Sequence, residues 1–220
     1  LGPDALNWVN GGEANWAAAG DVGFDGGPGG QSGELWGQGQ TSWLQTTVSG
    51  PGSLSYWWKV SCQSSYVEEN GGTNTGTGYW SSDYATFSVN GVEWERREGE
   101  SDWEQRTWSL PAGPHTLRWT YVKNSDGSAT GGQGRMWIDE VAFTITGLWL
   151  ASPGSAVDGR FRFELQAPAG TNYVIQASSN LTTWEPITTN TLPTNGVLTI
   201  TDPASANLPR RFYRAVQPQP

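Results

Sequence analysis

Nine residues, SLSYWWKVS (53–61), constrain the fold of this chain more than any other stretch. β-Branched and aromatic residues that follow the turn sequence at 50–52 predict a β-strand here. Side chains of a strand point alternately to its two faces, which places Leu54, Tyr56, Trp58 and Val60 on one face and Ser53, Ser55, Trp57, Lys59 and Ser61 on the other. The first face is a core face. The second would be an ordinary polar face without Trp57, which therefore needs either a covering segment or a ligand.

The remainder of the first 146 residues repeats this pattern of short strands and turns. With 30 Gly, 13 Pro and 15% charged residues among 220, the composition favours turns and strands over helices, and no run of a dozen residues carries a helical apolar stripe. Asn90 and Gly91 predict a tight hairpin between two strands. We expect an antiparallel sandwich with strands at 41–48, 53–61, 84–89, 92–96, 103–110, 114–123 and 136–144, and an edge strand at 6–9.

A second, smaller domain is predicted after a change of composition at 146–158. Tryptophans become rare there, and Ser152, Pro153 and Gly154 interrupt the strand pattern. A new set of short strands follows at 161–165, 173–177, 184–188, 197–201 and 212–216. We place the boundary at about residue 147, which gives a jelly-roll domain at 1–146 and a small immunoglobulin-like or fibronectin-like β-sandwich at 147–220. The predicted fold class is all-β.

Charge and composition exclude several partner classes. A formal net charge of −9 disfavours nucleic acid and anionic membranes, because both require clustered Lys and Arg. No apolar run reaches transmembrane length, and Leu1 in place of Met suggests a fragment of a longer precursor. The single cysteine, Cys62, rules out an internal disulfide and leaves the compartment open. Abundant Trp, Thr, Ser, Asn and Gly with few Lys are typical of secreted bacterial β-modules, so we expect a secreted monomer.

Catalytic motifs are missing from the sequence. There is no G-x-S-x-G elbow, no H-E-x-x-H and no Walker loop. His115 is the only histidine and sits at a strand entry, where a turn histidine is the ordinary interpretation. Cys62 has no activating base nearby in sequence, so a buried or inert thiol is expected. Carboxylate pairs such as Glu68 and Glu69 leave a glycosidase open, but we expect no enzyme.

Three segments of the first domain resemble a known kind of bacterial module: SWLQTTVSGPGSLSYWWKVS (42–61), DWEQRTWSLPAGPHTLRWTYVKN (102–124) and MWIDEVAF (136–143). They are similar to jelly-roll modules related to MAM domains and carbohydrate-binding modules, which are appendages of large secreted bacterial proteins. FRFELQAPAGTNYVIQASSNLTTWEPI and ANLPRRFYRAV resemble a C-terminal β-sandwich module of such proteins. The connection after WWKVS is usually short in this family, whereas here it extends over 62–83.

A calcium site is one expectation that follows in part from this resemblance, because such jelly rolls often hold one structural calcium between their first and last strands. Asp21 and Asp25, in a loop with six glycines at 21–33, could supply ligands together with Asp139. Calcium takes six to eight oxygens, many of them carbonyls, and loops at sandwich edges can provide them. The alternative is that Asp25 forms a simple turn and that Asp139 caps a strand or bulge.

A glycan-binding surface is the second expectation. A sugar ring binds where an aromatic side chain meets its C–H face and polar side chains take its hydroxyls. Trp57 shares its face with Lys59, and Arg118 and Gln105 have outward parity on neighbouring strands. The long polar segment 62–83 is expected to be ordered against the first domain, because it contributes aromatic residues that alternation does not bury, namely Tyr66, Tyr79 and Trp80. For each of these aromatics, ordinary packing remains the alternative.

Three functions therefore remain open after the sequence. The preferred hypothesis is a non-catalytic polysaccharide-binding module, fused to catalytic or cell-surface domains in the same chain. The second is a structural or adhesive spacer. The third is a polysaccharide hydrolase or lyase without a familiar motif.

Overall fold

The computed structural model describes residues 6–63, 82–124, 132–155 and 159–218, and it confirms the all-β class. Within these residues the only helical element is a single 3₁₀ turn, η1 (Ser205–Asn207), and no helix is long and apolar enough to cross a membrane. Contacts group the chain into two compact units, the first comprising Leu1–Val48, Leu54–Trp108 and Pro114–Phe143, and the second Ser49–Ser53, Ser109–Gly113 and Thr144–Pro220. The division at about residue 147 stays a prediction.

The first unit is one eight-stranded antiparallel sheet that folds over on itself. Its strands are β1 (Val9–Gly12), β2 (Ala17–Ala19), β3 (Gly29–Gln31), β4 (Thr41–Ser61), β5 (Tyr84–Val89), β6 (Val92–Glu98), β7 (Glu104–Val122) and β8 (Arg135–Ile145). The strand order is β2-β3-β8-β4-β7-β5-β6, and β1 pairs with β4. Between β5 and β6, Asn90 and Gly91 both have positive φ (52° and 80°), the geometry of the predicted hairpin.

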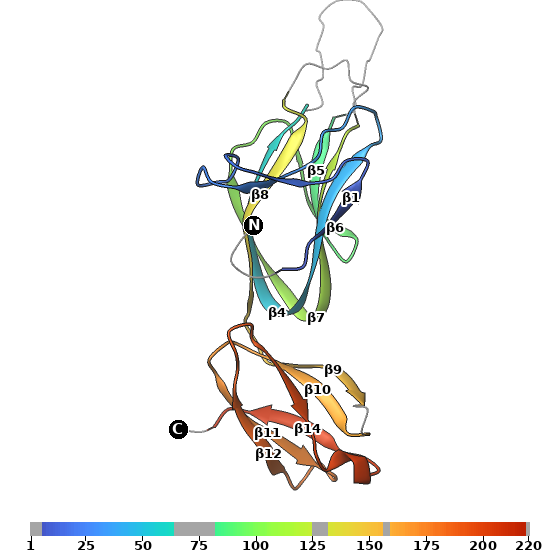
Figure 1. Ribbon diagram of the computed structural model, residues 1–220, viewed down its shortest axis with the longest axis vertical. Coiled ribbons are helices and arrows are strands. Elements are labelled where there is room, and N and C mark those ends of the chain that lie inside the picture. The colour runs from blue at the N-terminus through green and yellow to red at the C-terminus, as the bar shows by residue number, and fades with distance from the viewer. Residues whose placement is uncertain (1–5, 64–81, 125–131, 156–158, 219–220) are drawn as a thin grey trace, which may run out of the picture. The chain divides into compact units, whose positions relative to one another are not determined.

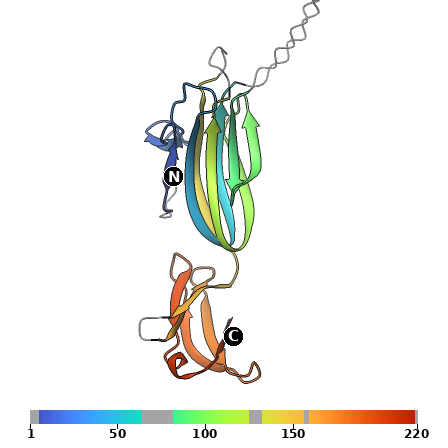
Figure 2. The same ribbon diagram turned by 90° about the vertical axis from the view of Figure 1, so that its right-hand side faces the viewer.

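Two long strands, β4 and β7, connect the two walls of this sandwich. Each was predicted as two strands separated by a turn; instead each runs without a break and folds back at the same end of the unit (Figures 1 and 2). In β4 the fold-back contains a cis peptide between Gly50 and Pro51. A side chain at Gly50 would come within 2.1 Å of the Pro111 carbonyl oxygen, so only glycine fits there. We call residues 41–48 the first limb of β4 and residues 54–61 the second limb.

The core follows the predicted alternation closely. On the second limb Leu54, Tyr56 and Val60 are fully buried and Trp58 is 2% exposed. On β7, the alternating residues Leu117, Trp119 and Tyr121 are also fully buried. Burying each large apolar side chain stabilises the fold by roughly 1.5–3 kcal/mol, so these alternating rows hold the two walls together.

The N-terminal segments differ from the sequence prediction. The first edge strand lies at Val9–Gly12 rather than at 6–9, and it pairs with the first limb of β4. Part of the glycine-rich segment 21–33, expected to be a loop, forms β3, in which Gly30 and Gln31 pair with β8. The predicted order of 62–83 falls mostly on residues 64–81, outside the described part of the chain.

The second unit is a small sandwich of two three-stranded sheets. Its strands are β9 (Trp149–Ser155), β10 (Phe161–Gln166), β11 (Asn172–Ser178), β12 (Glu185–Thr191), β13 (Val197–Thr201) and β14 (Phe212–Val216). The sheets have the orders β13-β10-β9 and β12-β11-β14. Its core contains Phe163, Leu165, Tyr173, Ile175, Leu192 and Ile200. β9 was not predicted, because Pro153 and Gly154 resemble a break; the pairing of β9 with β10 accommodates them by a register shift between Arg162 and Glu164.

Candidate ligand-binding surface

The outer face of the second limb carries a cluster of three aromatic side chains. The rings of Phe24 and Trp57 are stacked, with centroids 3.6 Å apart and planes 12° from parallel. Trp103 meets Phe24 edge-on, at 6.4 Å and 80°. Phe24 is 41% exposed, whereas Trp57 and Trp103 are half-buried. We call these three residues the aromatic platform. Trp57 is therefore covered by a segment that the sequence did not single out, the loop between β2 and β3.

A buried carboxylate fixes this loop over the sheet. Asp139, on β8 and 5% exposed, accepts the backbone N–H of Phe24 at 3.0 Å through Oδ2 and that of Glu140 at 2.8 Å through Oδ1. Gly23 packs so closely that a Cβ there would lie 2.7 Å from Asp139 Oδ2. Its N–H also donates to the Gly27 carbonyl at 2.8 Å. Asp139 and the glycine turn together position Phe24 on Trp57.

The three aspartates of the expected calcium site differ in exposure and in hydrogen-bond partners. Asp21 and Asp25 are exposed, and Asp25 Oδ1 accepts the N–H of Gly27 at 2.8 Å. Both oxygens of Asp139 accept backbone N–H groups, at the loop and at Glu140, which has a positive φ of 47°. Within the described residues, no three His, Cys, Asp or Glu side chains gather into a group that could hold a metal. Asp25 thus forms the turn, Asp139 caps backbone N–H groups at Phe24 and Glu140, and calcium stays a prediction.

Polar side chains flank the platform on two strands. Lys59 lies two residues beyond Trp57 on the same face of β4, and its ammonium is 5.9 Å from the Trp137 ring centroid. Trp137 is 5% exposed, and its indole N–H donates to Gln31 Oε1 at 2.8 Å. Gln105 lies two residues beyond Trp103 and is exposed. By strand parity, Lys59 and Gln105 therefore present an ammonium and an amide on the face that carries Trp57 and Trp103.

Arg118 contacts the first limb of β4, whereas Trp57 and Lys59 belong to the second limb. Its guanidinium stacks on Trp43 at 4.3 Å and donates to Gln45 Oε1 at 2.9 and 2.7 Å, and both residues belong to the first limb. Trp43 also packs against Gly11, where a Cβ would come within 2.6 Å of the indole. The two limbs of β4 belong to opposite walls of the sandwich (Figure 1), so Arg118 is not brought together with Trp57 and Lys59.

Tyr66, Tyr79 and Trp80, the other expected binding residues, lie outside the described part of the chain. The residue that sequence reasoning missed is Phe24. The available signal was its position: it is the only aromatic residue in the glycine-rich segment 21–33, where no alternation could bury it.

The two candidate catalytic side chains are buried in the scaffold. Cys62 is 2% exposed, and its thiol lies 3.2 Å from the Asp83 carbonyl oxygen. Burial raises the pKa of the Cys62 thiol to about 12, so the reactive thiolate is absent at neutral pH. His115 is 7% exposed, and its Nδ1 is 3.3 Å from the Asn90 amide nitrogen. These positions agree with the inert thiol and turn histidine that the sequence favours.

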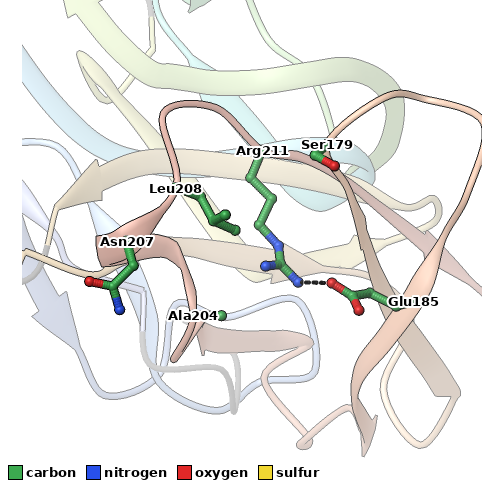
Figure 3. Close-up of a pocket in the computed structure, with 6 residues that line it drawn as sticks. All are labelled: Ser179, Glu185, Ala204, Asn207, Leu208 and Arg211. Carbon is green, nitrogen blue, oxygen red and sulfur yellow. Dashed lines mark hydrogen bonds and ion pairs between the residues drawn. The ribbon is translucent and has the colours of Figure 1, made fainter.

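The second unit contains a small cavity of about 370 Å³, lined by Ser179, Glu185, Ala204, Asn207, Leu208 and Arg211 (Figure 3). Arg211 bridges two carboxylates, with Glu185 Oε1 at 2.6 Å and Asp202 Oδ2 at 2.9 Å. The second contact is an ion pair without hydrogen-bond geometry, because Nε of Arg211 remains unsatisfied. Tyr213 also donates to Asp202 at 2.9 Å, and burial raises the pKa of its hydroxyl. Because these two carboxylates neutralise Arg211, we interpret the charged side chains of this cavity as a structural ion-pair cluster.

Comparison with known proteins gives distant similarity only. No family model matches the chain, and no curated protein matches it. Among solved structures, the secreted serine protease VesC from Vibrio cholerae aligns with a TM-score of 0.43 and 17% identity, over 62% of this chain and 24% of the protease. The K3 cleaved adhesin domain of Lys-gingipain from Porphyromonas gingivalis w83 aligns with a TM-score of 0.42 and 14% identity, over 63% of this chain and 91% of the domain.

Carbohydrate-binding modules are also among the matches. The CBM22-2 xylan-binding domain from Paenibacillus barcinonensis Xyn10C aligns with a TM-score of 0.37 and 10% identity, over 65% of this chain and 94% of that domain. The matches thus include both a binding module and a secreted enzyme, of which this chain covers 94% and 24%.

Proposed function

We propose that this chain is a non-catalytic polysaccharide-binding module of a secreted protein, with a small β-sandwich as companion. The observation that supports it is the aromatic platform, a stack of rings on the outer face of a sheet with its top ring 41% exposed. Large aromatic rings are normally buried in cores or interfaces. A solvent-facing ring with a fixed orientation matches the C–H face of a sugar.

The ligand would contact Phe24 and Trp103 rather than Trp57. Stacking with Phe24 already occupies the outward side of Trp57, which acts as a support. The ammonium of Lys59 and the amide of Gln105 would hydrogen-bond sugar hydroxyls beside the rings. The net charge of −9 favours a neutral or cationic polysaccharide over a polyanionic one.

Catalytic and cell-surface domains in the same secreted chain are the partners we propose for this module. A binding module raises the local concentration of a linked domain at its substrate. A spacer would bind no glycan, and a hydrolase or lyase would release reducing ends, so two assays separate the three hypotheses.

Calorimetry with soluble xylan, β-1,4-galactan and β-glucan tests the proposal directly. We expect one of these polymers to bind, and Phe24→Ala to weaken that binding by about 1–3 kcal/mol, because stacking supplies much of the contact energy. The melting temperature should change little, because Phe24 is a loop residue with an exposed ring.

Phe212→Ala is the matched control for this experiment. Phe212 is 36% exposed, close to the value for Phe24, but it belongs to β14 of the second unit. Its removal should leave glycan binding unchanged. The proposed function fails if the parent chain binds none of the polymers, and the platform is excluded as the site if Phe24→Ala binds as the parent does.

A further inference from the structure

Trp36 is the most exposed large hydrophobic residue of the described chain. Its side chain is 78% exposed, whereas its neighbour Leu35 is 7% exposed and belongs to the core. Single exposed apolar side chains are common on proteins, so exposure alone assigns no role. The hydrogen bonds that hold the backbone around Trp36 are the more informative feature.

Hydrogen bonds fix the backbone on both sides of this residue. Gln40 Oε1 accepts the N–H groups of Trp36 and Gly37, each at 2.8 Å. Gly39 donates to the Lys123 carbonyl at 2.8 Å, and Gln38 Nε2 donates to the Asn124 carbonyl at 3.0 Å. The loop is thus tied to itself and to the end of β7.

The segment just before Trp36 is tied to β8 as well. Arg135 donates to the Ser32 carbonyl at 3.2 Å and pairs with Glu34 at 3.0 Å. Trp36 is therefore an exposed indole on a loop anchored at both ends.

The indole has no structural task that the described residues reveal. Within the described part of the chain, no aromatic ring and no cationic side chain stacks on it, and its Nε1 donates to none of the described groups. Packing therefore does not explain the choice of tryptophan. Because the backbone that carries it is held in place, binding a flat apolar surface orders only the side-chain torsions of this ring.

We propose that Trp36 is a second sugar-contact site, at which the indole stacks on one pyranose ring of a polysaccharide. This inference rests on the proposed function and extends it from one contact to two. The sites share no described contact residue. The Trp36 loop is bound by Gln40, Lys123 and Asn124, whereas the platform is held by the second limb, by Asp139 of β8 and by the segment just before β7. Two contacts on one chain raise the affinity for a polymer above that for a short oligosaccharide.

The test compares a polymer with its trisaccharide on the full chain, using xylan with xylotriose and β-1,4-galactan with galactotriose. The parent should bind two trisaccharides, and Trp36→Ala should bind one. Affinity for the polymer should fall on the order of tenfold or more in Trp36→Ala, because the intramolecular second contact is lost. Trp36→Phe, which keeps a stacking ring, should restore most of it. The melting temperature should not move.

Oxidation by N-bromosuccinimide, read by mass spectrometry of the peptide that contains Trp36, reports on the site directly. Bound polymer should protect Trp36 from oxidation. Unprotected Trp36 and parent-like polymer binding by Trp36→Ala would overturn the inference, while a loss of binding in Phe24→Ala would still uphold the proposed function. If polymer binding is lost in Trp36→Ala but not in Phe24→Ala, Trp36 is upheld as a sugar contact and the aromatic platform is excluded. Absence of any glycan binding by the parent overturns both.

Discussion

Trp57 and Trp58 are adjacent residues of the same type with opposite surroundings. Trp58, on the inner face of the second limb, is 2% exposed and meets Tyr56 edge-on at 6.1 Å. The guanidinium groups of Arg97 and Arg106 lie 5.9 and 6.0 Å from its ring centroid. Trp57, on the outer face, is half-buried and is covered by Phe24 of a single loop.

The difference shows how each ring depends on the fold. β6, which carries Arg97, and β7, which carries Arg106, both contribute to the surroundings of Trp58, and both arginines pair with Glu95 and Glu104. Removing Trp58 would open a space between elements that cannot all move inward. Trp57 depends on one loop, which is anchored by Asp139. The inner face should therefore govern stability, and the outer face should govern binding.

The largest effect is expected from Trp58→Ala. Loss of this ring should destabilise the fold by about 3–5 kcal/mol, because the closed sandwich cannot collapse into the cavity. Urea unfolding of the full chain measures it. Phe24→Ala, the comparison on the outer face, should cost far less stability. Equal losses in the two variants would contradict the division between the faces.

An intermediate effect is expected from Asp139→Ala. Two backbone N–H groups, those of Phe24 and Glu140, would lose their acceptor, at a cost of about 1–3 kcal/mol. Because Asp139 positions Phe24, glycan binding should weaken as well. Asp139→Asn retains one carbonyl oxygen and should lose less of both. If Asp139→Ala has the stability and the glycan affinity of the parent, the loop is held by other contacts.

The smallest effect concerns Cys62, which continues the inner row beyond Val60. Burial raises the pKa of its thiol from an ordinary value near 9 to about 12, so the native state holds the proton more tightly than the unfolded chain does. Stability from this group is full below pH 9 and decreases as pH rises from 9 towards 12.

Melting temperatures at pH 8 and pH 10 test this pH dependence. The parent should lose more stability between these values than Cys62→Ala, in which the titrating group is absent. The variant also corrects for tyrosines such as Tyr56, whose pKa is raised by burial and which titrate at still higher pH. Identical pH profiles for the two proteins would mean that the thiol ionises without penalty in the native state.

Alternation by itself determined the inner face and most strands of both units, and the turn pair Asn90 and Gly91 determined the hairpin. These features follow from contacts close in sequence, because the direction of each side chain in a strand is set by its parity. The same parity placed Trp57 and Lys59 on the outer face of the second limb. It also gave Arg118 outward parity. Parity could not say which wall of the sandwich each limb of β4, or each half of β7, would join.

The tertiary structure alone decided what covers the outer face. Phe24 reaches Trp57 across 33 residues of sequence, and Asp139 reaches Phe24 across 115. Glycine-rich loops have no periodicity. The position of Phe24 as the only aromatic residue of segment 21–33 marked it, but nothing there indicated that Gly23 would lie against Asp139 or that Phe24 would stack on Trp57. Trp36 was likewise hidden, because its exposure depends on hydrogen bonds to Lys123 and Asn124, at the far end of β7. Strand periodicity is local and can be read from sequence, whereas the position of a loop depends on contacts between distant residues.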